Sequence, residues 1–428
     1  MRPECCPNVY SDILATLSKF IHSDEFANEA RCSERSFTRS RKMPLPQLTA
    51  FLINGVKRSL QTELIDFADF VLDDSSKTMT ASALCQARSN LNPDAMRALL
   101  RKQYQQICEQ IAAPTWLGYQ LFAVDGTTLR LPEHDVCREH FGGQTDARGQ
   151  KCPMARSVVL YDVARNCVAD AEFGSYHVGE QAMAAKLFGS LGSRDLVLYD
   201  RGFPSRSLFA EHERRCIPFC TRVVPKNWKA LKELVNQDQN DAVCKLGNDQ
   251  TPLKSLRFVV ARLPNGSQYH LVTNLMDPAI TPAMLADLYH SRWRIEEAFK
   301  QLKARMQIEH WSGILEHTIR QDYYAALIRH NFASLLILCS APYSMQATGR
   351  AGITNGPWIA FMNQALVTRS LKHKLPIMLL KPETLETLSN TLCEQCRTYA
   401  MIRKSLHAPA TKRKPRPKFT QPMHYKAA

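Results

Sequence analysis

Residues 121–131 read LFAVDGTTLRL and residues 194–200 read RDLVLYD, and these two stretches decide the fold. Each contains a short apolar run of the kind that is typical of a buried strand. Each apolar run ends in an aspartate, Asp125 or Asp200. Ligand sites in α/β sheets lie just outside the strand ends, so we expect both aspartates at a functional edge of one sheet. The alternative for either aspartate alone is an ordinary turn, since Asp-Gly is a common turn dipeptide.

The sequence around these stretches continues the pattern. ARSVVLYDV at 155–163 and NCVADAEFGS at 166–175 are further β-rich runs. Helical periodicity follows at Val178–Leu191 and again at Pro204–Arg215. Strands and helices in this order predict an α/β fold in which sheet and helices share one core. Strand-like sequence returns at about 216–277, which we expect to be a β insertion.

A helical hairpin is predicted before the first strand. Thr80 can cap a helix that ends near Asn90, and Pro93 suits the first turn of the next helix, where its missing N–H has no cost. Two helices joined by a tight turn resemble a helix-turn-helix, which would bind DNA. The cations that suit this function are Arg88, Arg97, Arg101 and Lys102. A purely structural hairpin is an equally good interpretation.

These patterns divide the chain into four parts. Residues 1–115 are expected to form a helical, DNA-binding N-terminal region, and residues 116–340 the α/β core with its β insertion. Residues 341–402 are mainly helical in periodicity. The tail at 403–428 contains eight Lys or Arg residues, four Pro and no acid, so we expect it to be mobile, with its charge solvated or bound to phosphate.

Composition indicates the class of partner. The chain has 428 residues, with 55 Lys and Arg against 40 Asp and Glu, and a formal net charge of +15, which favours a polyanion as partner.

Its longest apolar run is too short to span a membrane and its N-terminus lacks a signal peptide, so we expect a soluble cytoplasmic protein. Cys393 and Cys396 have CxxC spacing, but a zinc site needs more ligands than they supply, which favours unmetallated thiols.

A second chemical signal lies in residues 282–306, which read PAMLADLYHSRWRIEEAFKQLKARM. We expect one helix here, capped by Thr281. At about 100° per residue its polar residues form a single stripe bordering the apolar face. The stripe consists of Tyr289, Arg292, Glu296 and Lys303. A carboxylate flanked by cations and a phenol suits a metal ligand beside a phosphate clamp, and a salt-bridged amphipathic helix is the alternative.

The combination Y-x2-R-x3-E-x6-K with the motifs VDGT and YDRGF resembles the bacterial DDE transposases of insertion-sequence family four. The segment YHSRWRIEEAFKQLK at 289–303 is especially similar, and the resemblance covers about Leu84–Trp311. It implies a ribonuclease-H-like catalytic core with a β insertion between the second Asp and the Glu. It also implies cut-and-paste DNA transposition with a hairpin intermediate and strand transfer.

The resemblance also implies roles for single residues. Asp125, Asp200 and Glu296 would be catalytic and bind two Mg²⁺ ions, with Mn²⁺ as a substitute. Tyr289, Arg292 and Lys303 would bind the terminal DNA phosphates. Further DNA contacts are expected from Arg222, on the first strand of the insertion, and from an aromatic side chain that stacks on a flipped base. The family has Trp where this chain has Tyr269, so Tyr269 and the insertion's Trp228 are rival candidates, and either could be core packing.

The resemblance implies double-stranded DNA as partner, both the inverted-repeat ends of the element and the target, bound by a homodimer on paired ends. It places the protein in the bacterial cytoplasm, associated with the nucleoid and not with a membrane. Two alternatives stay open. A ribonuclease-H-like nuclease or resolvase would share the carboxylates but not need the polar stripe. A catalytically inactive DNA-binding relative would not need the intact Asp125, Asp200 and Glu296.

Overall fold

A computed structural model describes residues 7–39, 42–145, 149, 151–247, 253, 255–262, 268–304, 306–347, 358–361, 364–399 and 401–404. The chain divides into two compact units. We call them the helical unit (Met1–Ala112, Arg130–Cys137 and Leu302–Ala428) and the sheet unit (Ala113–Leu129 and Arg138–Gln301).

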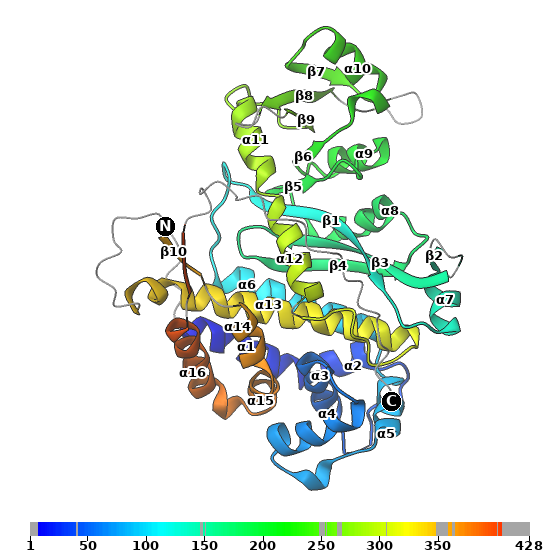
Figure 1. Ribbon diagram of the computed structural model, residues 1–428, viewed down its shortest axis with the longest axis vertical. Helices are drawn as coiled ribbons and strands as arrows, with labels where there is room; N and C mark the ends of the chain where they lie inside the picture. Colours follow the sequence, from blue (N-terminus) through cyan, green and yellow to red (C-terminus); the bar gives the residue numbers. More distant parts are fainter. Residues whose placement is uncertain are drawn as a thin grey trace. The chain divides into compact units, whose positions relative to one another are not determined.

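A single mixed sheet, with nine strands among the described residues, organises the sheet unit (Figure 1). Its strands are β1 (Gln120–Arg130), β2 (Gly143–Thr145), β3 (Lys151–Asp162), β4 (Cys167–Ser175), β5 (Asp195–Tyr199), β6 (Phe219–Arg222), β7 (Asp241–Lys245), β8 (Ser255–Arg262) and β9 (Gln268–Thr273). The order is β2-β3-β1-β5-β6-β9-β8-β7, with β4 paired to β3. Strands β1, β5 and β6 run parallel to one another, whereas the pairs β3–β4, β6–β9 and β8–β9 are antiparallel. This arrangement confirms the predicted α/β class.

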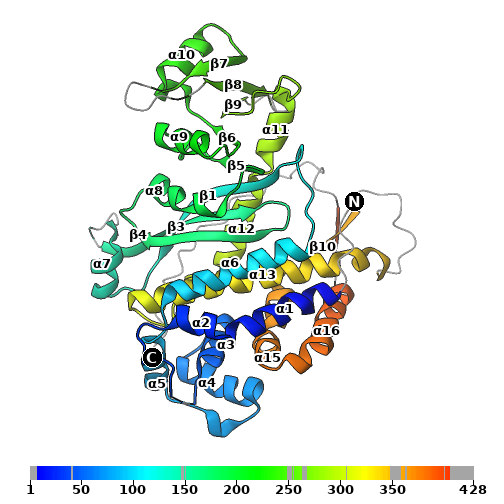
Figure 2. The same ribbon diagram turned by 180° about the vertical axis from the view of Figure 1, so that it is seen from behind.

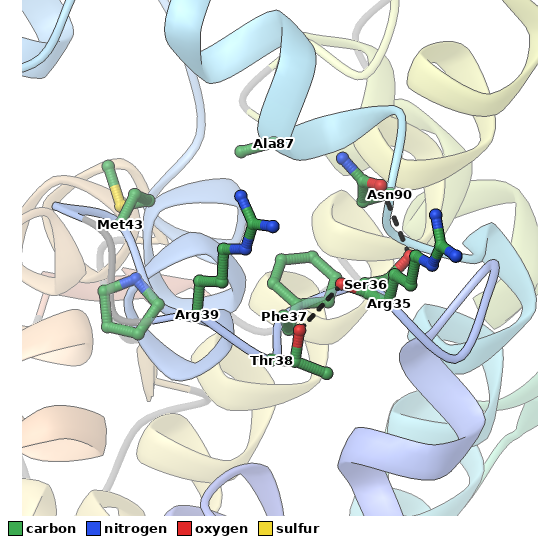
Figure 3. Close-up of a pocket in the computed structure, with 9 residues that line it drawn as sticks. Arg35, Ser36, Phe37, Thr38, Arg39, Met43, Ala87 and Asn90 are labelled. Carbon is green, nitrogen blue, oxygen red and sulfur yellow. Dashed lines mark hydrogen bonds between the residues drawn. The ribbon is translucent and has the colours of Figure 1, made fainter.

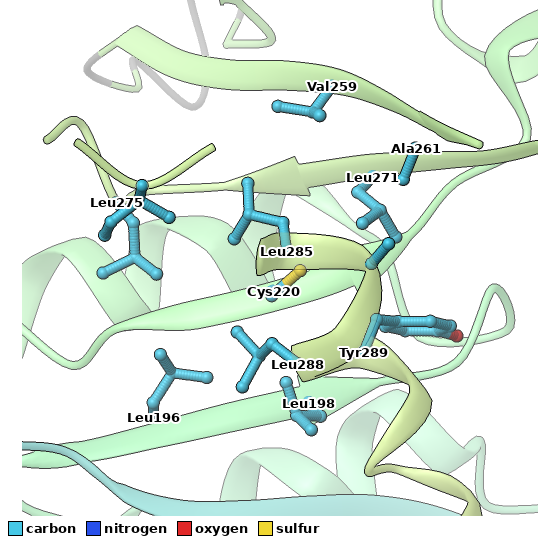
Figure 4. Packing of buried hydrophobic residues seen from close by; sticks show 12 residues of the cluster. Leu196, Leu198, Cys220, Val259, Ala261, Leu271, Leu275, Leu285, Leu288 and Tyr289 are labelled. Carbon is cyan, nitrogen blue, oxygen red and sulfur yellow. The ribbon is translucent and has the colours of Figure 1, made fainter. Parts of the chain in front are cut away.

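Helices cover both faces of the central strands. The helices of the sheet unit are α8 (Glu180–Ala185), α9 (Arg206–Arg214), α10 (Lys229–Asn236), α11 (Pro282–His290) and most of α12 (Trp293–Ala304), with short 3-10 turns at Lys186–Ser190 and Pro225–Asn227. Leu196 and Leu198 of β5 pack with Leu285 and Leu288 of α11, in a cluster that includes strands β6, β8 and β9 (Figure 4). Tyr199 points to the opposite face, where its hydroxyl meets His212 of α9. Strand alternation therefore separates the two helical layers.

The predicted helix at 282–306 differs from the observed structure in one respect. Thr281 caps α11 by accepting a hydrogen bond from the Met284 N–H at 3.3 Å, as expected. The helix is interrupted at Ser291 and Arg292, between α11 and α12. Backbone bonds there join residues three apart, such as Arg292 N–H to Tyr289 O at 3.1 Å, so the chain tightens at this point instead of continuing as one regular helix.

The helical unit is built around two long helices, α6 and α13, which lie side by side in both views (Figures 1 and 2). Its α-helices are α1 (Pro7–Ile21), α2 (Asp24–Ala30), α3 (Leu45–Asn54), α4 (Leu60–Phe67), α5 (Ala81–Arg88), α6 (Pro93–Gln110), α13 (Glu316–Ala347), α14 (Gln364–Leu371), α15 (Lys374–Leu380) and α16 (Leu385–Thr398). Shorter elements are a π-helical turn (Ala68–Leu72), 3-10 turns (Ser75–Lys77 and Pro382–Thr384) and the strand pair β10 (Trp358–Phe361) and β11 (Met401–Lys404). Helix α7 (Asp135–Phe141) belongs partly to each unit.

The predicted hairpin is confirmed as α5 and α6, and one of its four cations has a structural role. Thr80 accepts a hydrogen bond from Ala83 N–H at 3.2 Å and caps α5, and Asn92 accepts one from Asp94 N–H at 3.1 Å and caps α6. Arg88, one of the four cations that would suit DNA contact, is buried. It donates to Gln321 at 2.9 Å and to Asp322 at 2.9 Å on α13. Arg88 therefore ties α5 to α13, because a buried guanidinium needs partners of this kind.

The C-terminal part contributes further helices to the helical unit. Cys393 and Cys396 lie buried on α16 as free thiols, and burial raises the pKa of both.

Beyond Lys404, the basic tail lies outside the described residues. None of the helices in the described part of the chain combines the length and apolar character needed to span a bilayer.

Candidate active site

Strand register brings the two predicted aspartates to one edge of the sheet. In the parallel pair β1–β5, Val124 lies opposite Tyr199, so Asp125 and Asp200 are the next residues on adjacent strands. The parallel pair β5–β6 continues the row, because Tyr199 lies opposite Thr221 and Arg222 follows. Two carboxylates and a guanidinium thus leave three neighbouring strands at the same level. Rigid, apolar strands hold each backbone in place, which suits a site that needs fixed geometry.

The junction of α11 and α12 brings the helical residues to the same edge. The Tyr289 hydroxyl donates a hydrogen bond to Asp200 Oδ1 at 3.1 Å. Arg292 donates from Nη1 to Asp125 Oδ2 at 3.3 Å and from Nη2 to Glu296 Oε1 at 2.7 Å. Through these bonds Tyr289 and Arg292 connect all three predicted carboxylates, which come from two strands and one helix.

The charges at this edge interact strongly. The pKa of Asp125 is raised to about 6, mainly because burial disfavours its charged form. Arg292 and the Gly126 N–H lower it in part, and the charges of Asp200 and Glu296 raise it. Burial alone would lower the pKa of Arg292, but Tyr289 and the nearby carboxylates raise it overall. Arg292 is therefore a permanent cation among carboxylates that repel one another.

An aromatic pair extends the site toward Arg222. The rings of Tyr289 and Tyr269 meet edge to face, with centroids 5.5 Å apart. The guanidinium of Arg222 lies over the Tyr269 ring at 4.9 Å, a distance typical of a cation–π contact. Trp228, the rival aromatic candidate, instead packs against Phe209 of α9 and beneath Arg206. The structure thus brings Tyr269 and Arg222 to the site and places Trp228 in a separate contact.

Lys303 is on α12, in its last turn, two turns beyond Glu296. It belongs to the helical unit, whereas Glu296 belongs to the sheet unit. Burial lowers the pKa of Lys303, and the nearby Glu309 opposes that shift.

Glu180, at the start of α8, is a neighbour of the site that our sequence analysis did not single out. Its carboxyl group lies so close to Gly126 that a Cβ atom on that residue would be 2.5 Å from the Glu180 carboxyl carbon. The next residue, Gln181, donates to Gly202 O at 3.2 Å, in the loop that follows Asp200. The absence of a side chain at Gly126 permits this approach, and an Asp-Gly pair read only as a turn gives no hint of it.

The donor set is suited to a hard divalent cation, although the carboxylates are not gathered around one point. Asp125, Asp200 and Glu296 offer only oxygen atoms, which Mg²⁺ and Mn²⁺ prefer. Within the described residues, no three His, Cys, Asp or Glu side chains are close enough to share a metal ion. Arg292 instead supplies the positive charge between Asp125 and Glu296. The carboxylates repel one another, and a cation bound between them would reduce this repulsion.

Comparisons with known proteins give one consistent result. The family described as a transposase DDE domain matches residues 116–332. The chain is similar to the transposase InsG for insertion sequence element IS4 of Escherichia coli (strain K12), with 26% identity over 325 residues, 71% of this chain and 72% of that protein. It is also similar to the "Probable transposase for insertion sequence element IS5377" of Geobacillus stearothermophilus, with 29% identity over 106 residues, 24% of this chain and 28% of that protein.

Among solved structures, the chain is similar to a piggyBac transposase synaptic complex with hairpin DNA. The match covers 96% of this chain and 84% of that chain, with a TM-score of 0.45 and 12% sequence identity.

Proposed function

The chain belongs to the DDE transposases of the insertion-sequence type and is a DNA transposase, and from this premise we propose that Asp125, Asp200 and Glu296 are the catalytic carboxylates of a cut-and-paste reaction. The observation that carries the proposal is the hydrogen-bonded group at the sheet edge. Asp125 and Asp200 directly follow the last paired residues of the parallel strands β1 and β5, and Arg292 joins Asp125 to Glu296. The strand order β4-β3-β1-β5-β6 supports a ribonuclease-H-like core around this site.

Asp125, Asp200 and Glu296 would hold Mg²⁺, as two ions, with Mn²⁺ as a substitute. Bound there, the metal would lower the pKa of an attacking water or 3′-hydroxyl and stabilise the leaving oxygen. The chain's own contribution is to position the carboxylates: Tyr289 orients Asp200 through its hydroxyl, and the strands fix the separation of the two aspartates. Arg292, buried and positively charged, would exchange a carboxylate for a phosphate of the DNA end.

Further residues are assigned to the DNA end. Arg292 and Lys303 would bind terminal phosphates, together with Arg222. Tyr269 is the better candidate for stacking on a flipped base during hairpin formation, because its ring touches Tyr289 and lies under Arg222. Trp228 remains the rival, and its packing on α9 makes it the weaker one.

We extend the proposal to the rest of the chain. Residues 1–115 bind DNA at the element ends, residues 116–340 form the catalytic core with its insertion at about 216–277, and residues 341–402 and 403–428 are a helical region and a basic tail. The protein acts as a homodimer on paired inverted-repeat ends, joins them to target DNA, and works in the cytoplasm at the nucleoid. The net charge of +15 supports contact with DNA.

The test compares the wild type with Asp125→Asn, Asp200→Asn and Glu296→Gln on labelled end-bearing DNA with Mg²⁺. Each variant should lose nicking on a denaturing gel but retain DNA binding in a mobility-shift assay, because affinity comes mainly from the cations. Arg194, exposed at the opposite end of β5 from Asp200, offers the matched control, and Arg194→Ala should nick like the wild type. A variant that nicks at the wild-type rate removes its residue from the active site.

The same gel separates the proposal from a ribonuclease-H-like nuclease. A transposase should convert nicked ends into hairpin and joined products, whereas a nuclease should accumulate nicks or breaks. An inactive DNA-binding relative should shift the DNA and cut nothing. Wild-type protein that binds ends and yields only nicks would favour the nuclease.

A further inference from the structure

The helical unit contains a pocket of about 460 Å³ between α5 and the loop that follows α2 (Figure 3). The loop contributes five consecutive lining residues, Arg35 to Arg39, and the hairpin contributes Ala87 and Asn90. Among the described residues that line it, none has an acidic side chain. The pocket is therefore positively charged, with a lining that is part polar and part apolar, and it adjoins the turn between α5 and α6.

Hydrogen bonds hold this loop against the hairpin. Cys32 N–H donates to Asn90 O at 3.2 Å, and Asn92 N–H donates to Ala30 O at 2.9 Å. The Ser36 hydroxyl, which is buried, donates to Asn90 Oδ1 at 3.3 Å. A loop anchored at several points along its length can present its side chains in fixed positions.

The loop backbone carries a conformation that costs free energy. Phe37 has a φ of 59°, in the left-handed region that bulky residues rarely occupy. Its half-buried ring lines the pocket instead of joining the apolar core. Such a conformation persists only where the surrounding bonds enforce it, and it is found disproportionately at ligand sites.

Two cations at this pocket have no partner within the described part of the chain. Arg35 and Arg39 are exposed, and neither guanidinium forms a hydrogen bond or ion pair there. Figure 3 shows both groups ending without a bond to the other residues drawn. Other arginines of the same unit form hydrogen bonds within the protein: Arg88 donates to Asp322, and Arg329 donates to Ile53 O. The two loop arginines are thus available for an outside anion.

We propose that the pocket formed by Arg35–Arg39 and Asn90 binds the phosphate backbone of DNA, with Arg35 and Arg39 as the phosphate ligands. Guanidinium groups match the geometry of phosphate oxygens, and the Phe37 ring offers a surface for a deoxyribose. The Asn90 amide donates one of its two hydrogens to Gln86 O at 2.7 Å and has the other to offer. The inference deepens the proposed function, because it locates a DNA contact of the helical unit that is separate from the carboxylates. A backbone contact fixes the register of the duplex and does not itself read the sequence.

The experiment measures affinity of the full-length protein for end-bearing and random duplexes over a range of salt concentrations. Arg35→Ala and Arg39→Ala should each weaken binding to both duplexes alike, by roughly tenfold, and reduce the salt slope by about one. Arg39→Glu should weaken binding further, and Arg39→Lys should recover part of it. Arg194→Ala is the control for a change in net charge alone. Thermal unfolding of each variant checks that the fold is kept.

Each outcome decides one question. Uniform loss with a reduced slope, absent in Arg194→Ala, supports the phosphate site. Loss confined to end-bearing DNA would show that the arginines read bases, which overturns the proposal, and so would unchanged binding or an equal loss in the control. Wild-type protein that fails to bind either duplex would instead count against the proposed function itself.

Discussion

Tyr289 belongs to an apolar cluster, but its hydroxyl forms a hydrogen bond with a carboxylate of the candidate site. It donates a hydrogen bond to Asp200 at 3.1 Å, and its ring packs with Leu285 and Leu288. Tyr119 packs on the same cluster, and its hydroxyl has no hydrogen bond among the described residues. Removing the hydroxyl from each tyrosine in turn therefore distinguishes the effect of the bond to Asp200 from the effect of losing any hydroxyl in this cluster.

Replacing Tyr289 by Phe should slow nicking while leaving DNA binding and stability nearly unchanged. The change removes a hydrogen bond to a charged acceptor, worth about 1.5–3 kcal/mol, which corresponds to a rate loss of roughly tenfold to hundredfold if the bond is kept during reaction. Tyr119→Phe is the control and should nick like the wild type. The measurement is the single-turnover nicking rate on end DNA. Equal rates for Tyr289→Phe and Tyr119→Phe would mean that Asp200 is positioned without the phenol.

At the scale of secondary structure elements, a buried histidine on α9 is hydrogen-bonded to Tyr199 of β5, the residue before Asp200. His212 on α9 contacts Tyr199 Oη at 2.9 Å through Nε2 and Ile217 O at 3.0 Å through Nδ1. Burial lowers the pKa of His212 to about 4, against an ordinary value of 6.5. The neutral ring is therefore a part of the packing that holds β5, the strand that directly precedes Asp200.

This pKa predicts acid sensitivity. Between pH 6.5 and 4 the unfolded chain binds a proton at His212 that the folded chain does not, so stability falls as the pH is lowered through this window. The loss should approach about 1.4 kcal/mol per pH unit from this residue. His212→Gln should be less stable than the wild type at pH 7 but lose less stability on acidification. Urea unfolding at pH 7, 6 and 5 for both proteins measures the difference, and parallel pH profiles would assign the acid sensitivity to other groups.

The elements also show what sequence can and cannot predict. Apolar runs that end in Asp125 and Asp200 predicted two strand ends at one edge. The register of Val124 with Tyr199 places the two aspartates at one level, as expected, but β1 continues to Arg130, so Asp125 is not at a strand end. The interruption of the helix at Ser291 was not predicted, since the local sequence is as helical as its surroundings. For Arg88 the sequence left DNA contact and a structural role equally open, because its partner Asp322 is distant in sequence. Glu180 was missed for the same reason: its neighbour Gly126 is brought near only by the fold.

For the whole molecule, positive charge sets the expected affinity for DNA. The chain carries a formal net charge of +15, and the cations assigned to DNA are divided between the pocket at Arg35–Arg39, the sheet edge and the basic tail. Each phosphate neutralised adds about 0.9 to the magnitude of the salt slope, so the slope measures how many of these cations engage. Contributions from well-separated groups should add.

Truncation after Lys404 tests the tail within this scheme. It removes six Lys or Arg residues and spares Arg403 and Lys404, which lie in β11 and pair with β10. Affinity should fall for end-bearing and random DNA alike, and the salt slope should decrease by up to about five if every removed cation meets a phosphate. Combined with Arg39→Ala, the truncation should lower the slope by the sum of the separate changes. If the truncation weakens binding to end-bearing DNA only, the tail contributes to sequence recognition. If the double variant has the same salt slope as the truncation alone, the tail and the pocket bind the same phosphates.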